Sequence, residues 1–282
     1  MQPRKLNAAT LRRAGVIAMR AALLPVCVAS FLALHGAPAH AQGGPPPEPG
    51  KWSVRIGAGG ILAPIYPGSR SLGFTPIPLV DLAYRPGLPG LDTVFLNARD
   101  GLGIVAVRFG AISVGGGVGY ARGRDQDVAA RLNGMGDISS AAAGNLFVRA
   151  DFGPVGFSAR AEKAFGGQSG TTAAVGASYR IPVTADFSLA ARVDGTWADQ
   201  SHMQEWFGIS GLKAQRTSFQ AYRPESGMRD VTFMLSATYA ITQQWRINGS
   251  AGVVHLLGDA AKSPITQRRT QPIAMFGATY QF

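Results

Sequence analysis

The chain has 282 residues, of which 46% are hydrophobic and 15% charged, with 37 glycines and a formal net charge of +11. This composition is too apolar for a disordered chain, too rich in glycine for a helical enzyme and too poor in charge for an ordinary soluble surface. The single cysteine, Cys27, excludes a disulfide framework and a thiolate metal cluster.

The first 41 residues have the form of a cleaved signal peptide. Residues 1–20 contain five basic residues and no acidic one, residues 21–34 are apolar, and Ala39-His40-Ala41 is a small-x-small cleavage sequence. Lipidation at Cys27 is the alternative, although Val26 is larger than the residue that normally precedes a lipidated cysteine. Removing the five basic residues lowers the net charge from +11 to +6, and export separates the chain from nucleic acid, so we expect no nucleic-acid partner.

A Pro/Gly-rich lead-in, residues 42–51, precedes a domain at 52–282 in which apolar residues recur at every second position. In 231–239, for example, Val231, Phe233 and Leu235 alternate with Thr232, Met234 and Ser236. Such strands have one polar face that contacts water and one apolar face. We predict strands at 52–62, 74–84, 91–98, 101–109, 111–121, 143–152, 155–164, 171–180, 187–197, 229–240, 245–256 and 272–282.

The predicted connections alternate in length. Short turns are expected at 109–111, 152–154, 181–186 and 241–244, and long loops at 122–142, 198–229 and 257–271. Strands close to the ~9–11 residues that cross a bilayer, with short turns on one side and long loops on the other, are typical of outer-membrane barrels. The sequence therefore predicts an all-β fold, a transmembrane antiparallel up-and-down β-barrel of about 12 strands (10 to 14), in the outer membrane of a Gram-negative bacterium after Sec-type export. A soluble β-sandwich is the alternative, but it leaves the apolar faces unexplained.

The polar face of the predicted strands contains both signs of charge. If the apolar positions face lipid, eight charged residues point into the lumen, where unpaired charges are costly: Arg149, Asp151, Arg160, Glu162, Arg180, Arg192, Asp194 and Arg246. One interpretation is a paired network that plugs a narrow barrel. The other is a water-filled pore whose excess of arginine prefers anions.

Several motifs, spread in order over the whole mature chain, resemble those of the MipA/OmpV family of outer-membrane proteins. They include Pro64-Ile-Tyr-Pro-Gly-Ser69, Leu132-Asn-Gly-Met-Gly-Asp137, Thr196-Trp-Ala-Asp199, Phe207-Gly-Ile-Ser210, Leu257-Gly-Asp-Ala-Ala-Lys-Ser-Pro264 and the terminal Phe276-Gly-Ala-Thr-Tyr-Gln-Phe282. The sequence departs from the family pattern at His202, where we expect tyrosine, and at Arg70, where an acidic residue is common. The family-motif loop residues are Trp197, Asp199, Phe207, Gly208, Asp230, Gly258, Asp259, Ser263 and Pro264.

The resemblance implies an outer-membrane barrel that interacts with a lytic transglycosylase and has a scaffolding role in murein assembly. OmpV-like members are linked to adhesion, osmotic response and antibiotic binding. We therefore expect an envelope interaction or scaffolding protein, with a lytic transglycosylase or another murein-machinery protein as its partner. The alternative function is a narrow diffusion channel for small, anionic solutes.

Other site types have weaker support. His202 and His255 are the only histidines after residue 41, and their neighbours along the chain do not define a triad or a zinc-site spacing. We expect no catalytic activity, no cofactor and no metal. Loop cations on the outer rim are predicted to contact outer-membrane lipid and lipopolysaccharide phosphates, with a solvated face as the alternative; they are Arg122, Arg124, Arg268 and Arg269.

Overall fold

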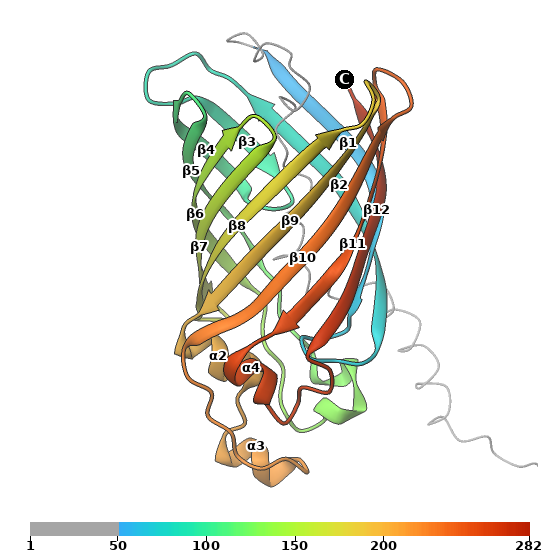
Figure 1. Ribbon diagram of the computed structural model, residues 1–282. Coiled ribbons are helices and arrows are strands. Elements are labelled where there is room, and N and C mark those ends of the chain that lie inside the picture. Colours follow the sequence, from blue (N-terminus) through green and yellow to red (C-terminus); the bar gives the residue numbers. More distant parts are fainter. Residues whose placement is uncertain (1–50) are drawn as a thin grey trace, which may run out of the picture.

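The computed structural model describes residues 51–282, in which twelve antiparallel strands form a closed barrel (Figure 1). Each strand pairs with its neighbours in chain order, and β12 pairs with β1 to complete the ring. The strands are β1 (Trp52–Pro64), β2 (Leu72–Tyr84), β3 (Thr93–Asn97), β4 (Gly101–Phe109), β5 (Ile112–Ala121), β6 (Ala141–Phe152), β7 (Val155–Gly166), β8 (Thr171–Pro182), β9 (Phe187–Ala198), β10 (Gly227–Ala240), β11 (Trp245–Leu256) and β12 (Thr270–Gln281). The expected signal peptide, and the lead-in up to residue 50, lie outside the described residues.

The predicted fold class, the alternation and the short and long connections are confirmed. In β10 the side chains of Phe233 and Leu235 point outward and are 43% and 55% exposed, whereas Thr232 and Met234 point inward and are buried. This alternation places an apolar surface on the outside of the whole barrel. None of the helices among residues 51–282 is long and apolar enough to cross a membrane.

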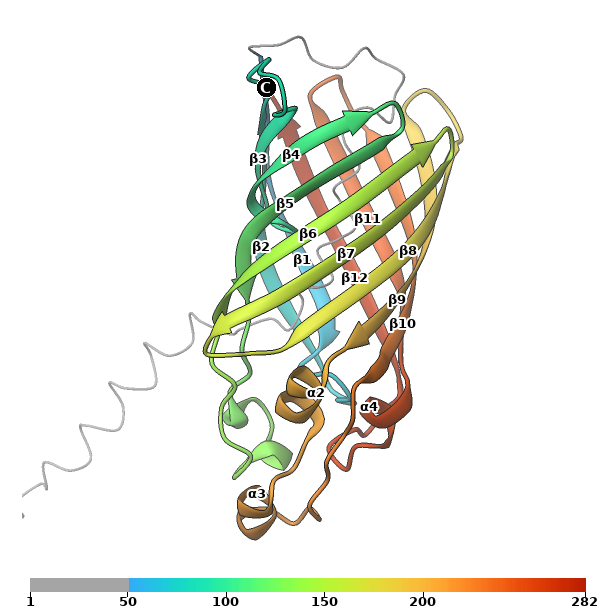
Figure 2. The same cartoon turned by 90° about the vertical axis from the view of Figure 1, so that its left-hand side faces the viewer.

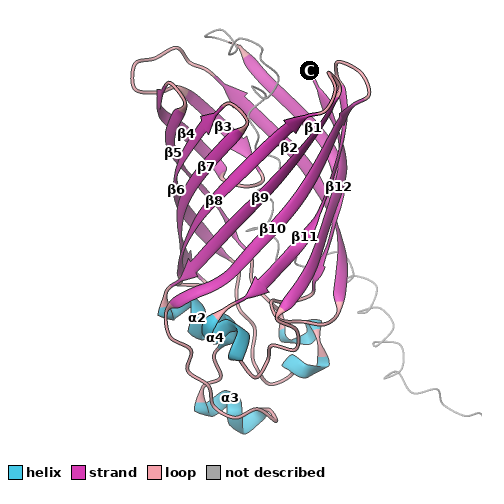
Figure 3. Cartoon of the chain, in the orientation of Figure 1, coloured by secondary structure: helices cyan, strands magenta, loops and turns pink. Residues whose placement is uncertain are grey.

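All the short helices of the described residues lie at one end of the barrel, opposite the C-terminus (Figures 1 and 3). They belong to the long connections, and the other end carries the short turns. The helices are η3 (Gln126–Val128), η4 (Ala130–Leu132), α2 (Gln200–Phe207), α3 (Gly211–Arg216) and α4 (Gly258–Lys262).

One strand is shorter than predicted. We expected a strand at 91–98, but β3 contains only Thr93–Asn97. The chain turns at residues 98–100 because the Asn97 side chain accepts hydrogen bonds from the backbone N–H groups of Arg99 and Asp100, at 2.9 and 2.7 Å. The hairpin of β3 and β4 therefore stops well short of the long-loop end that its neighbours reach (Figure 2).

Candidate functional site

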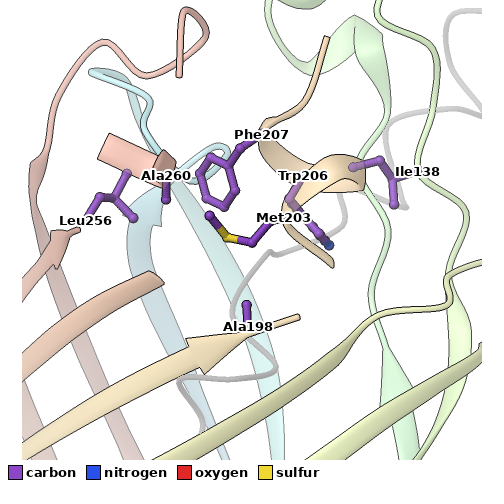
Figure 4. Close-up of a cluster of buried hydrophobic side chains, with 7 residues drawn as sticks. All are labelled: Ile138, Ala198, Met203, Trp206, Phe207, Leu256 and Ala260. Carbon is purple, nitrogen blue, oxygen red and sulfur yellow. The ribbon is translucent and has the colours of Figure 1, made fainter. Parts of the chain in front are cut away.

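The long loops form a packed cap over one end of the barrel. A first cluster of buried side chains joins α2 to the loop between β5 and β6, to the ends of β9 and β11, and to α4 (Figure 4). Its centre is Met203 and Phe207, both 1% exposed. The complete cluster is Ile138, Ala198, Met203, Trp206, Phe207, Leu256 and Ala260.

A second buried cluster extends the cap to the loop between β1 and β2. Tyr66 from this loop packs with Leu132, Met135, Ile209 and Ile265, and each of these five side chains is at most 1% exposed. Burial also raises the pKa of the Tyr66 hydroxyl, which therefore stays protonated. The four connections at this end thus pack together through two buried clusters and do not move independently.

The family-motif residues support this cap. Asp199 accepts a hydrogen bond from the backbone N–H of His202 (2.8 Å) and so caps the N-terminus of α2. The hydroxyl of Ser263 donates to the carbonyl of Phe207 (2.6 Å), which joins the β11–β12 loop to the β9–β10 loop. The Asp259 carboxylate accepts the backbone N–H of Glu225 at 3.0 Å, and this bond lowers the pKa of Asp259.

The remaining motif residues are placed around these contacts. Gly208 ends α2, and Gly258 begins α4 with a φ of +47°. The carbonyl of Pro264 accepts a hydrogen bond from Arg131 (2.7 Å), and Asp230 is buried beside Arg229. Trp197 differs from the others because it is 38% exposed, on the outward face of β9.

His202 is neutral inside the cap. Nη1 of Arg229 lies 3.0 Å from Nε2 of His202, and the His202 ring stacks on Trp206 at 5.9 Å. Burial, and then the charge of Arg229, lower the pKa of His202 from 6.5 to about 3. Because Arg229 has only donors, Nε2 must accept and Nδ1 carries the proton.

Acidification is expected to loosen the cap. When the cap opens, His202 regains a pKa of 6.5, so between pH 6.5 and about 3 the open form binds more protons and stability falls as pH falls. At pH 5 the opening equilibrium should be about 30-fold more favourable than at neutral pH. Trp206 fluorescence, in a variant with the other tryptophans replaced by phenylalanine, measures the opening. H202Q can still accept from Arg229 and does not titrate, so an identical acid response in H202Q would contradict the assignment.

The lumen contains a network of charged side chains centred on Asp100. The Asp100 carboxylate, 1% exposed, is 2.5 Å from Nη2 of Arg149 and 2.9 Å from Nη1 of Arg160. Arg160 also pairs with Glu162 and donates to the carbonyl of Arg99 (3.0 Å). The turn at 98–100 is thus folded inward and held by β6 and β7.

Small residues on β5 make this inward turn possible. A Cβ atom on Gly117 would lie 2.6 Å from the Asp100 carbonyl oxygen, and one on Gly115 would lie 2.6 Å from the Phe147 ring. Both distances are shorter than any normal contact. The glycine-rich sequence of β5 therefore provides the flat surface on which the turn and Phe147 pack.

The structure brings together part of the predicted lumen set. Arg192 pairs with Asp194 through two hydrogen bonds (2.6 and 2.5 Å) and also donates to Ser158. Among residues 51–282, Arg180, Arg246 and Asp151 make no ion pair; they lie near the short-turn end, and Asp151 is exposed. Asp100 was not among the predicted lumen residues, because nothing in the sequence shows that the turn between β3 and β4 points inward.

The predicted lipopolysaccharide-facing cations do not share one environment. Arg124 is 2% exposed, its Nη1 donates to the Trp206 carbonyl (3.3 Å), and its guanidinium lies 6.0 Å from the Trp206 ring. The prediction that Arg124 faces lipid phosphates is therefore wrong, because this residue is a core element of the cap. Arg268 and Arg269 are exposed, and Arg122 is partly buried at the end of β5.

The groups considered for catalysis have structural contacts. His255 lies on the outward face near the end of β11, where its Nδ1 is 2.8 Å from the Thr270 hydroxyl. The Ser263 hydroxyl donates its hydrogen bond to the Phe207 carbonyl. Within residues 51–282 no three metal-ligating side chains gather. These contacts join β11 to β12 and the β11–β12 loop to the β9–β10 loop.

The closed barrel, with an apolar exterior, a charged interior and long loops at one end only, defines the class: this protein is an outer-membrane β-barrel. Residues 56–282 match the family described as MltA-interacting protein MipA. The chain belongs to this family. No curated protein matches the sequence.

Solved outer-membrane barrels are similar in fold. An outer membrane channel from Pseudomonas putida F1 is 12% identical, with 87% of this chain and 99% of that chain covered and a TM-score of 0.46. The KdgM porin is 12% identical (82% and 99% covered, TM-score 0.41), and the NanC porin is 8% identical (82% and 100% covered, TM-score 0.40).

Proposed function

We propose that this protein is a non-enzymatic interaction or scaffolding protein of the cell envelope, with a lytic transglycosylase or another murein-machinery protein as its partner. The family name describes a protein that interacts with MltA. The observation that carries the proposal is the capped barrel, in which four loops share a buried core over one end. A structure closed in this way supports a role in binding rather than in bulk diffusion.

The lumen supports the same proposal. The inward turn and its ion pairs, Asp100 with Arg149 and Arg160, occupy space that an open pore would leave to water. In this class of barrel the short turns face the periplasm. A murein-machinery partner would therefore meet the face that carries the short turns and the C-terminus.

A narrow channel for anions is the second candidate. The guanidinium groups of Arg149, Arg160 and Arg192 lie on the inner faces of β6, β7 and β9, and rings of arginine favour anions in pores. Each of these arginines has a carboxylate partner, however, which reduces the positive potential available to a solute.

Two measurements on the same detergent-purified preparation test the proposal. We expect an immobilised sample to capture a lytic transglycosylase from envelope extracts, and an unrelated outer-membrane barrel prepared in the same way to capture none. We expect planar bilayers containing the inserted protein to remain silent. Anion-selective conductance without capture would overturn the proposal in favour of the channel.

A further inference from the structure

The barrel wall is incompletely paired at one seam. β2 is paired with β1 along its whole length, but it is paired with β3 only through residues 81–84. Among the described residues, 72–80 therefore have no strand on the side away from β1. Across the seam, β5 pairs with β4 only up to Val118. The wall is closed in the half near the short turns and notched in the half near the long loops.

This notch follows from the inward turn at 98–100. The β3–β4 hairpin stops there because its tip is held inside the barrel by Arg149, Arg160 and Asn145, whose side-chain amide donates to the Asp100 carbonyl at 3.0 Å. The neighbours β2 and β5 continue beyond that level without a strand between them. The interruption is thus built into the fold by specific contacts.

The notch lies in the part of the wall that faces hydrocarbon. Large apolar side chains point outward on both of its sides, with Phe74 55% exposed on β2, Leu102 61% exposed on β4 and Val118 62% exposed on β5. An open sheet edge persists at membrane depth only where it is buried in protein or lines a cavity. The unpaired edge of β2 lies in the half of the wall towards the outer leaflet, since the long loops are on the external side in this class.

The open edge of β2 is a poor site for an added strand. Pro76 and Pro78 lie on it, and proline has no N–H to donate to a ladder. Prolines at such positions are one way in which proteins prevent pairing at an edge. A β-strand of another chain is therefore not expected to pair with this edge of β2.

The inner lining on the β2 side of the notch is apolar, although barrel interiors are usually polar. Ile77 points inward at the edge and packs against a cluster that contains Ile61 and Met275. On the β5 side the turn at 98–100 lies against Gly117, so the apolar surface beside the notch is the one on β2. This surface is suited to a thin hydrocarbon chain.

We propose that the notch is a lipid site, in which an acyl chain of an outer-leaflet lipopolysaccharide passes between β2 and β5 and lies against Ile77. Arginines lie where the headgroup would be: Arg70, which is exposed and whose Nε donates to the Gln267 carbonyl (3.4 Å), lies two residues before β2, and Arg122 directly follows β5. Guanidinium groups bind phosphates through charge-assisted hydrogen bonds. This inference is independent of the partner protein proposed above.

Site-specific photocrosslinking in cells tests the site. The photoreactive residue p-benzoylphenylalanine is placed at Ile77, at Phe74 as an outward control and at Ala174 as an inward control, because Ala174 on β8 is flanked by fully paired strands. After irradiation, we expect lipopolysaccharide adducts at Ile77 and Phe74 and none at Ala174. Heat-modifiable migration on gels verifies that each variant is folded.

The outcomes separate the possibilities. Adducts at Phe74 but none at Ile77 would show that lipid stays outside the wall and would overturn the proposal. A protein adduct at Ile77 would overturn it as well, in favour of a polypeptide occupant. If the Ile77 variant does not fold, the same measurement at Thr75, the next inward position on this edge, decides between these results.

Discussion

Replacing Asp100 with asparagine is expected to lower the free energy of unfolding of the barrel by about 3 to 5 kcal/mol, the usual cost of removing one partner from a buried ion pair. The carboxylate is 1% exposed and touches two arginines, so its loss leaves Arg149 without a carboxylate partner and Arg160 with Glu162 alone. The substitution changes neither shape nor volume appreciably. Urea titration of protein in lipid vesicles, followed by tryptophan fluorescence, measures the change.

The matched control is D151N. Asp151 is also an inward carboxylate, but it is exposed and makes no ion pair among residues 51–282. Substitutions of this kind change stability by less than about 0.5 kcal/mol. Equal effects of D100N and D151N would show that the network contributes no specific stability.

Replacing Phe207 with alanine is expected to destabilise the cap by about 3 to 5 kcal/mol, the range for deletion of a buried aromatic ring. Phe207 is 1% exposed and packs with Met203, Leu256 and Ala260, while its carbonyl accepts from Ser263. Because these contacts lie mainly in the loops at the end of the barrel, the barrel strands should remain folded. Hydrogen exchange of residues 199–226 should accelerate, and protease added to intact cells should cleave these loops.

L212A provides the comparison for this prediction. Leu212 belongs to α3 in the same loop but is 68% exposed, so its truncation should leave hydrogen exchange and cleavage unchanged. If F207A were as protected as L212A, the packed cap would not describe the protein in the membrane.

The strands could be predicted because membrane strands alternate with a strict period of two, and each of the twelve expected segments begins and ends within two residues of the observed strand. The inward direction of the turn between β3 and β4 could not be predicted. It depends on Asn97, on the glycines of β5 and on arginines of β6 and β7, and no local pattern encodes that combination.

The candidate site was less predictable for a related reason. Arg124 looks like any loop cation in the sequence, and its burial results from Trp206, which is 82 residues away. The pairing of Arg192 with Asp194 could be predicted from the sequence, because positions two apart on a strand share a face. Contacts within a strand can be inferred from spacing, whereas contacts among four loops need their spatial arrangement.

The ion pairs of the wall also affect how the chain is inserted. Arg160 with Glu162 and Arg192 with Asp194 are each on a single strand, so each pair can form before distant segments meet. A guanidinium that is neutralised early costs less to bring to bilayer depth. The link from Asp100 to β6 and β7 needs several hairpins at once, so insertion can proceed with local charge compensation and finish when this last bridge forms.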